Sequence, residues 1–427
     1  MKLKNLLLAG LTIAAMTACS NDNEFVDNGN QTKGEEASMR INLKFANEVN
    51  TRADAPDDKS GDKKAGEDFE IASANVTAII EYPNSNKRLV YKNLTLVPGN
   101  AGTYQTNAFS VEAGSNVNVY AIVNYGEDAA NKLNIEKLAE LTVGAQTLPD
   151  VEESLAYIAN TVAKKDAFLM SGKVEKVNIE AGSKENKARI SVDRVAAKLD
   201  ERTPEDPFII IDGNKIYNTK EDVSILITGF SFSNLSSDSY VFSGETSPSS
   251  WLQKYVPAGE KADSTTYRWI KDNITYCLEN NTGNPTKVHY KGQVCLGGKA
   301  LKDNFYIRAV TLDNKTIYRL FTSWEELTGY YNDDTISKLD KDAIETLAKY
   351  GINKYFGGVC YYEADIKTHS PEESTSVLRN NWYELKVKTI SKIGYPTPTP
   401  EIKPEDTMLD IITTVNPWTI QVNNFEL

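Results

Sequence analysis

The sequence has very few of the residues that most often catalyse reactions or bind metals. Only two of its 427 residues are histidines, His289 and His369, and only four are cysteines. It also lacks the spaced motifs of zinc proteases, serine hydrolases, thiol redox centres and calcium-binding loops. We therefore predict that the chain is not an enzyme and has no catalytic residue, bound metal or cofactor. His289 lies in an alternating Val-His-Tyr segment, which favours a structural role in a strand.

A glycine-rich segment comes close to a phosphate-binding loop without matching it. In Gly292–Ala300 the spacing is off by one residue, and Ala300 stands where a serine or threonine would bind Mg²⁺. The Gly297-Gly298 pair is more typical of a turn between two strands. We therefore predict no nucleotide site here.

The chain also has no block of basic residues. Its net charge is −12, with 25% charged residues and a mean hydropathy of −0.43. A protein that binds nucleic acid needs basic side chains against the phosphates, so we predict no nucleic-acid partner. Beyond the first 18 residues, no apolar run is long enough to cross a membrane as a helix.

The first 18 residues have the pattern of an export signal. Lys2 and Lys4 precede an apolar core, and small residues follow it. The segment ends in Met-Thr-Ala before Cys19, which is similar to the lipobox of bacterial lipoproteins. We expect cleavage before Cys19 and attachment of a lipid to its sulfur. The alternative is an ordinary signal peptide followed by an incidental cysteine.

Three cysteines remain after Cys19, so at most one disulfide bond can form within the chain. Cys277 and Cys295 lie in neighbouring strand-like segments and could meet across a hairpin. The sequence leaves open whether they are joined. Cys360 is the third thiol.

A segment soon after the leader has the alternation of a half-buried strand. Every second residue is apolar: Met39, Ile41, Leu43 and Phe45. A polar stretch rich in Asp, Lys and Gly follows, up to about residue 68. Such stretches are exposed and open to proteases. A cut between Arg52 and Ala53 would remove the strand together with the leader.

The end of the chain has the pattern of two short strands. Apolar and β-branched residues recur at every second position on each side of Pro417, which cannot donate a hydrogen bond within a sheet. Residues 396–404 are proline-rich and would extend roughly 28 Å at about 3.1 Å per residue. Such a spacer suits a strand that reaches another subunit, although the tail could also fold back onto its own domain. The expected donor residues are Leu409, Ile411, Val415, Trp418, Ile420, Val422 and Phe425.

Between these ends the sequence predicts two mostly β domains, with a polar, proline-containing boundary near residues 201–207. Helical patterns occur at 129–141, 149–164 and 338–350. Strands are expected at 75–82, 88–96, 117–123, 168–172, 188–199, 223–232, 287–296, 305–311, 315–322, 359–366 and 382–390. The predicted division is 1–18 signal peptide, 19–52 lipidated propeptide with the removable strand, 53–200 first β domain, 201–395 second β domain, and 396–427 spacer with donor strands.

Together these features suggest one assembly mechanism. A protease that cuts after Arg52 would release the chain from its lipid and remove the Met39–Phe45 strand. The apolar groove left behind would then accept the C-terminal strands of another copy by strand addition. Head-to-tail exchange of this kind builds an open filament.

Several short motifs, in their order along the chain, resemble those of a known family. Together with the lipobox-like leader and the context of Arg52, they are similar to the fimbrillins of type V pili, most closely the shaft subunits of short, Mfa-like fimbriae. The motifs are Val119-Tyr-Ala-Ile-Val-Asn124, Phe168-Leu-Met-Ser-Gly-Lys173, Val192-Asp-Arg-Val-Ala-Ala-Lys-Leu199, Arg379-Asn-Asn-Trp-Tyr-Glu-Leu385 and Asn416-Pro-Trp-Thr419.

The resemblance implies two β-sandwich domains of transthyretin-like fold, with a few short helices and a C-terminal donor-strand tail. It implies a precursor held in the outer membrane by a palmitate-carrying Cys19, and an Arg-specific protease that cuts after Arg52. It also implies three kinds of partner at the cell surface: other copies of the chain in a head-to-tail polymer, a fimbrial anchor subunit and a fimbrial tip subunit. The polymer would support adhesion.

Two other interpretations remain. In the first, the chain is a monomeric surface lipoprotein that binds a glycan or a protein, with its tail folded back. In the second, it is an enzyme such as a glycosidase, which would need two carboxylates facing each other across a cleft.

Overall fold

The computed structural model describes residues 35–45, 75–98, 103–124, 163–164, 167–182, 185–236, 241–242, 251–254, 269–271, 275–368, 376–398 and 409–417. The chain divides into two compact units. The first contains the described residues up to Phe45, those from Asn75 to Asn124 and those from Met170 to Val192. The second contains the others. Strands dominate both units, so the prediction of a mostly β fold is confirmed.

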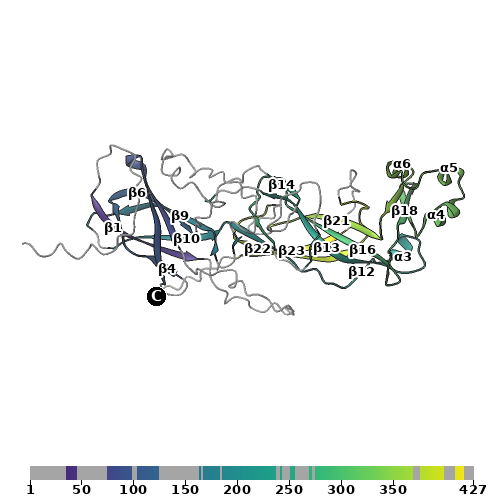
Figure 1. Ribbon diagram of the computed structural model, residues 1–427, viewed down its shortest axis with the longest axis horizontal. Coiled ribbons are helices and arrows are strands. Elements are labelled where there is room, and N and C mark those ends of the chain that lie inside the picture. Colours follow the sequence, from purple (N-terminus) through teal and green to yellow (C-terminus); the bar gives the residue numbers. More distant parts are fainter. Residues whose placement is uncertain are drawn as a thin grey trace, which may run out of the picture. The chain divides into compact units, whose positions relative to one another are not determined.

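The first unit is a sheet that closes on itself. Its strands follow the order β10-β9-β6-β2-β3-β4-β1-β5, and β1 also pairs with β10 at the far end of that order. Figure 1 shows β1, in purple, beside β10. The elements are β1 (Glu36–Phe45), β2 (Asn75–Tyr82), η1 (Pro83–Ser85), β3 (Lys87–Pro98), β4 (Thr103–Thr106), β5 (Phe109–Glu112), β6 (Gly114–Val123), β9 (Met170–Ile179) and β10 (Asn186–Arg194).

Period-two alternation explains why segments such as β10 form strands. In β10, the side chains of Ala188, Ile190 and Val192 are buried. The intervening residues from Lys187 to Ser191 are exposed. One face of each such strand therefore lines the core of the unit and the other faces solvent.

The second unit contains two sheets around one core. One follows the order β15-β11-β22-β23, and the other is built on β12-β13-β16-β17 with β14 beside β13 and β21 beside β16. Their buried side chains form one cluster, with Leu199 and Tyr383 from the first sheet and Phe232 and Tyr290 from the second. The strands are β11 (Ala196–Glu201), β12 (Phe208–Ile209), β13 (Val223–Ser236), β14 (Trp251–Lys254), β15 (Thr275–Leu278), β16 (Lys287–Leu296), β17 (Lys299–Ala300), β21 (Val359–Asp365), β22 (Asn381–Ile390) and β23 (Leu409–Pro417).

Residues 305–355 add a small sheet with short helices and a core of its own. The sheet has the order β19-β18-β20. Tyr306 and Phe321 from its strands pack with Leu327, Ile336 and Leu347 from the helices. The elements are β18 (Phe305–Leu312), β19 (Lys315–Phe321), α4 (Trp324–Tyr331), α5 (Asp334–Ser337), α6 (Ile344–Lys349) and β20 (Ile352–Tyr355). Three short elements complete the second unit: β7 (Ala163–Lys164), β8 (Ala167–Phe168) and α3 (Gly213–Ile216).

The structure differs from the sequence prediction in several elements. The strand expected at 188–199 is two strands, because β10 ends at Arg194 and β11, which begins at Ala196, pairs with β15 and β22 of the second unit. The units accordingly divide after Val192, earlier than the boundary expected at residue 200.

The predicted helices also differ. The helix expected at 338–350 is shorter, since α6 covers only Ile344–Lys349, and α4 was not predicted. The helix expected at 129–141 lies outside the described residues. Of the helix expected at 149–164, only residues 163–164 are described, and they form β7.

Candidate functional site

The candidate site is the groove occupied by β1. Along one edge, Met39 to Phe45 pair in parallel with Asn186 to Val192 of β10. Along the other edge, the first half of β1 pairs antiparallel with β5 and the second half with β4. Because β1 joins β10 to β4 and β5, it is the strand that closes the first unit.

The inward side chains of β1 are deeply buried. Ile41 and Leu43 are 0% exposed and Met39 is 1% exposed. Burying three such side chains stabilises the unit by roughly 5–9 kcal/mol as an upper estimate. The side chain of Phe45, the fourth residue predicted for the removable strand, lies outside the description, although its backbone pairs with Val192.

Two side chains of the groove bind the main chain of β1. The Ile41 N–H donates to the Thr106 hydroxyl over 3.0 Å. On the opposite edge, the Asn186 side-chain amide donates to the Ser38 carbonyl over 3.0 Å. The Arg40 guanidinium adds a bond of 3.2 Å to the Thr106 carbonyl. The sequence pattern found the apolar side chains but gave no sign of these polar contacts.

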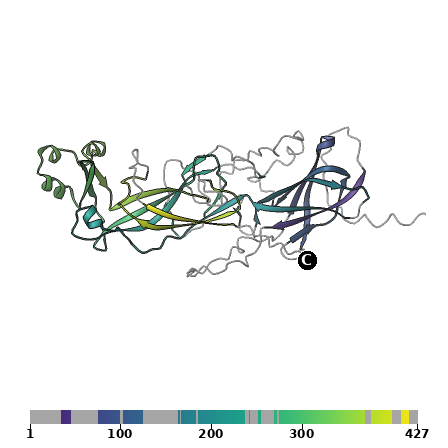
Figure 2. The ribbon, with the colours of Figure 1, turned by 180° about the vertical axis from the view of Figure 1, so that it is seen from behind.

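The other half of the predicted mechanism concerns the C-terminal tail. In the structure, β23 of this tail pairs with a strand of its own chain. Leu409 to Pro417 pair antiparallel with Asn381 to Ile390 of β22, with an irregularity between Val387 and Thr389. Figure 2 shows β23, in yellow, beside β22 in the second unit. β23 is the outermost strand in the order of its sheet. It continues through Asn416 to Pro417, whereas the sequence predicted a break there.

Several predicted site residues lie outside the described part of the chain. For Leu409, Ile411 and Val415 the structure gives backbone pairing only. The residues not described are Cys19, Arg52, Ala53, Trp418, Ile420, Val422 and Phe425. Their predicted roles in lipidation, cleavage and strand donation stay predictions.

The disulfide left open by the sequence does not form. Cys277, Cys295 and Cys360 are free and buried. Cys277 lies in β15, which pairs with β11, whereas Cys295 lies in β16, which pairs with β13. Burial raises the pKa of Cys277 to about 12 and that of Cys360 to about 11, so both thiols stay protonated.

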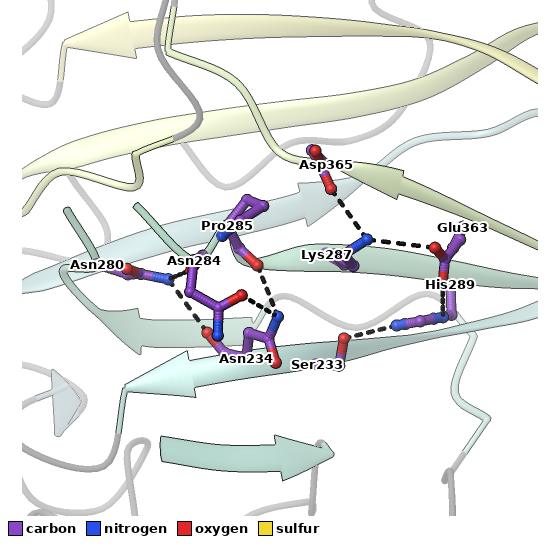
Figure 3. Close-up of polar contacts among 9 residues, drawn as sticks. All are labelled: Ser233, Asn234, Asn280, Asn284, Pro285, Lys287, His289, Glu363 and Asp365. Atoms are coloured by element: carbon purple, nitrogen blue, oxygen red, sulfur yellow. Dashed lines mark hydrogen bonds and ion pairs between the residues drawn. The ribbon is translucent and has the colours of Figure 1, made fainter. Parts of the chain in front are cut away.

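A Ser-His-Glu group in the second unit invites comparison with a hydrolase triad. The Ser233 hydroxyl lies 2.6 Å from His289 Nε2, but His289 Nδ1 lies 3.9 Å from Glu363 Oε2, which is beyond hydrogen-bond distance. The three residues come from neighbouring strands, and His289 is only 2% exposed. Figure 3 shows Glu363 and Asp365 both turned toward Lys287, at 3.2 and 3.3 Å. These side chains form a row of polar contacts across neighbouring strands, which fits a structural role.

The same close-up shows an asparagine network at the turn between β15 and β16. The Asn280 side-chain amide donates to the Asn234 and Asn284 carbonyls over 3.3 and 2.9 Å. The Asn234 side-chain amide donates to the Pro285 carbonyl over 2.9 Å. These bonds fix the turn by satisfying its backbone carbonyls.

Neither metal binding nor a membrane helix is found in the part of the chain that the structure describes. There, no three His, Cys, Asp or Glu residues are grouped so that they could hold a metal ion. Within the same ranges, no helix has the length and apolar character needed to span a membrane.

Comparison with known proteins identifies one segment. Residues 353–424 match the C-terminal part of the fimbrillin family, described as major fimbrial subunit protein type IV. The predicted resemblance to fimbrillins is thereby confirmed for this segment. The match is to structural subunits, in agreement with the prediction that the chain is not an enzyme. No curated protein matches the chain.

The solved structures that match this chain include two from Porphyromonas gingivalis. The tip fimbrial protein Mfa3 with a C-terminal truncation is 11% identical, with a TM-score of 0.43, over 90% of this chain and 100% of that one. A fimbrilin (fimA) is 16% identical, with a TM-score of 0.46, over 91% and 99%. With TM-scores below 0.5, neither adds to the family match, which covers residues 353–424 alone.

Proposed function

We propose that the chain is a structural subunit of a cell-surface fimbria, built into the shaft and supporting adhesion. It is exported as a lipoprotein precursor through Cys19, matured by an Arg-specific protease at Arg52, and polymerised by strand exchange. The fimbrillin match over residues 353–424 supports the fimbrial part of this proposal. The observation that carries strand exchange is the position of β1, which closes the first unit and precedes the predicted cleavage site in the sequence.

In this mechanism, cleavage frees β1 from the rest of the chain. Loss of β1 would uncover the edges of β10, β4 and β5, together with the cavity that holds Met39, Ile41 and Leu43. Unpaired strand edges and exposed apolar surface both favour addition of another strand. The C-terminal strand of a second copy fills the groove, and repetition builds a filament that also includes anchor and tip subunits.

The decisive experiment combines cleavage with assembly. The chain from Ser20 onward is treated with an Arg-specific protease, and its mass and oligomeric state are measured together. Cleavage after Arg52 followed by SDS-resistant ladders is the expected result, and Arg52→Ala should remain uncut there and monomeric. A chain that is cut at this position, loses β1 and still stays monomeric would contradict polymerisation by strand exchange.

A second candidate is a monomeric surface lipoprotein that binds a glycan or a protein. The observation that favours it is the pairing of β23 with β22 in the same chain. In the fimbrial mechanism, either β23 leaves the edge of β22, or β23 stays there and the residues after Pro417 act as the donor strand. The two candidates therefore differ in whether removing the tail affects assembly.

A further inference from the structure

Two arginines lie opposite each other on the small sheet of residues 305–355. Arg308 of β18 and Arg319 of β19 are register partners, so their side chains leave the same face of the sheet. Like charges in directly opposite positions destabilise a pair of strands. Both residues are partly exposed, and no carboxylate among the described residues forms an ion pair with either guanidinium. The pair therefore presents two positive charges that this part of the chain leaves without a partner.

Both guanidiniums are held against aromatic rings. Arg308 lies 4.0 Å from the centroid of the Tyr331 ring. Arg319 lies 4.0 Å from the centroid of the Tyr330 ring. The two rings pack edge to face on each other, and both contact Phe321, which is 2% exposed. A guanidinium stacked on a fixed ring loses little conformational entropy when it binds a ligand, because its orientation is already set.

The guanidiniums keep N–H groups for an outside acceptor. Among the described residues Arg308 makes no hydrogen bond, and its buried Nε has no acceptor there. Arg319 binds the Asn218 side-chain oxygen, in the amide orientation that satisfies both groups. Asp333 does not pair with Arg308, because its carboxylate caps α5 by accepting from the Thr335 N–H over 2.7 Å. The pKa of Asp333 is lowered first by this N–H and only last by the charge of Arg308.

Exposed apolar side chains border the arginines on the same face of the sheet. Val310 follows Arg308 at the next position of that face, and the register partner of Val310 is Ile317. Ile317 is 47% exposed, and Leu312, two positions beyond Val310, is 58% exposed. A ligand held by the arginines would therefore also contact aliphatic surface.

We infer that Arg308 and Arg319 form a binding site for the carboxylates of an acidic protein segment. A carboxylate accepts two parallel hydrogen bonds from a guanidinium, and its negative charge relieves the repulsion between the two arginines. The aliphatic border favours a protein segment over an acidic sugar, since apolar side chains buried against it add to the binding free energy. A segment that carries both acidic and apolar residues complements the charges and the apolar border of this face.

The test measures binding to the uncleaved chain from Ser20 onward. The probe is a short fluorescent peptide in which glutamate and leucine alternate, and the control peptide has glutamine in place of glutamate. The neutral peptide should bind at least about tenfold more weakly than the acidic one. Arg308→Gln combined with Arg319→Gln should weaken binding of the acidic peptide by at least about tenfold.

Matched variants separate this site from general electrostatic attraction. Lys299→Gln combined with Lys302→Gln removes the same charge from two exposed positions and should change the affinity by less than about twofold. Arg308→Lys combined with Arg319→Lys keeps the charge but loses the planar fork, so most of the affinity should be lost. Ile317→Thr should weaken binding by about threefold through the apolar border. Circular dichroism checks the fold of each variant, and the lysine variant decides the question if the glutamine variant does not fold.

Equal affinity for the two peptides, or unchanged affinity in the arginine variants, would overturn the site. An oligosaccharide of glucuronate is measured in parallel. Arginine-dependent binding of this sugar that is tighter than binding of the acidic peptide would overturn the assignment to a protein partner. None of these results bears on the fimbrial proposal, because the assay requires neither cleavage at Arg52 nor polymerisation.

Discussion

Glu201 is a half-buried acid at the end of β11. Its carboxylate accepts from the Thr203 N–H over 2.9 Å and from the Tyr290 hydroxyl over 3.3 Å. Burial raises the pKa of this carboxyl to about 7, so it changes charge near neutral pH. Thr203 in turn accepts from the Val387 N–H over 2.9 Å, beside the irregular pair of β22 and β23.

Glu201 should make the stability of the second unit fall as pH rises. Its folded pKa lies above the usual unfolded value near 4.3, so the folded state binds the extra proton. This contribution is fully present below about pH 4 and is lost as pH rises through about 7, with an upper size of about 3 kcal/mol. Denaturant unfolding between pH 5 and 8 should show this slope, and Glu201→Gln should flatten it. An unchanged slope in the variant would assign it to another group.

A second prediction concerns the buried pair of Arg379 and Glu279. The guanidinium donates to the Glu279 carboxylate over 2.9 Å and to the Val241 carbonyl over 2.9 Å. Arg379→Met should cost about 3–5 kcal/mol of unfolding free energy, because it leaves a buried carboxylate without its cation. The double variant with Glu279→Gln should recover a part of that loss. A double variant less stable than Arg379→Met would contradict this account.

Neither the raised pKa of Glu201 nor the pairing of Arg379 with Glu279 could be predicted from the sequence. Glu201 is one of 59 acidic residues, and nothing in its local pattern separates it from solvated ones. Its environment comes from Tyr290, which lies on a strand of the facing sheet. Properties set by such distant contacts require the fold.

At the scale of elements, β1 should dominate the stability of the first unit. Ile41→Ala in the precursor should lower its unfolding free energy by about 2–5 kcal/mol, since Ile41 is fully buried between two strand edges. Lys44→Ala, on the outward face of the same strand, should change it by less than about 0.5 kcal/mol. Thermal or denaturant unfolding of the two variants measures the difference. Similar losses in both would mean that the inward face contributes little.

Strands were predictable from local composition even where alternation is incomplete. β2 and β16 match the expected ranges because they are rich in β-branched and aromatic residues, although β2 is buried throughout Val76–Tyr82. α4 was missed because only Leu327 is fully buried among its eight residues, so no apolar stripe appears. Its start is nevertheless encoded, since Ser323 accepts from the Glu326 N–H and Glu326 accepts from the Thr322 N–H.

At the scale of the whole molecule, the tail should be needed for assembly but not for folding. Among the residues that the structure describes, removal of Met408–Leu427 takes away only β23, the outermost strand in the order β15-β11-β22-β23. The truncated chain should therefore fold as a monomer with its core intact, yet form no ladders after cleavage at Arg52. Circular dichroism and size-exclusion chromatography of the truncated and full-length chains measure both properties. Unimpaired ladders without the tail would contradict its role as donor.

The sequence predicted the apolar faces of β1 and of the tail but not their neighbours. Parallel pairing of β1 with β10 joins segments far apart in the chain, and no local pattern specifies such a partner. Likewise, the alternation in Leu409–Val415 fits an apolar groove in another copy as well as the edge of β22. The partner of such a strand is set by contacts far away in the sequence, which no local pattern encodes.

The closure of the first unit by β1 also sets a time order for folding. The side chain of Asn186 binds Ser38 across a separation of 148 positions. The first strand of the unit can therefore pair with β10 only after the last strand has formed. If the chain is exported amino end first, as proposed, this unit cannot close until nearly 200 residues have been exported, and long-range closure of this kind is slow. Until then the apolar face of β1 has no partner strand and stays open to binding by another protein.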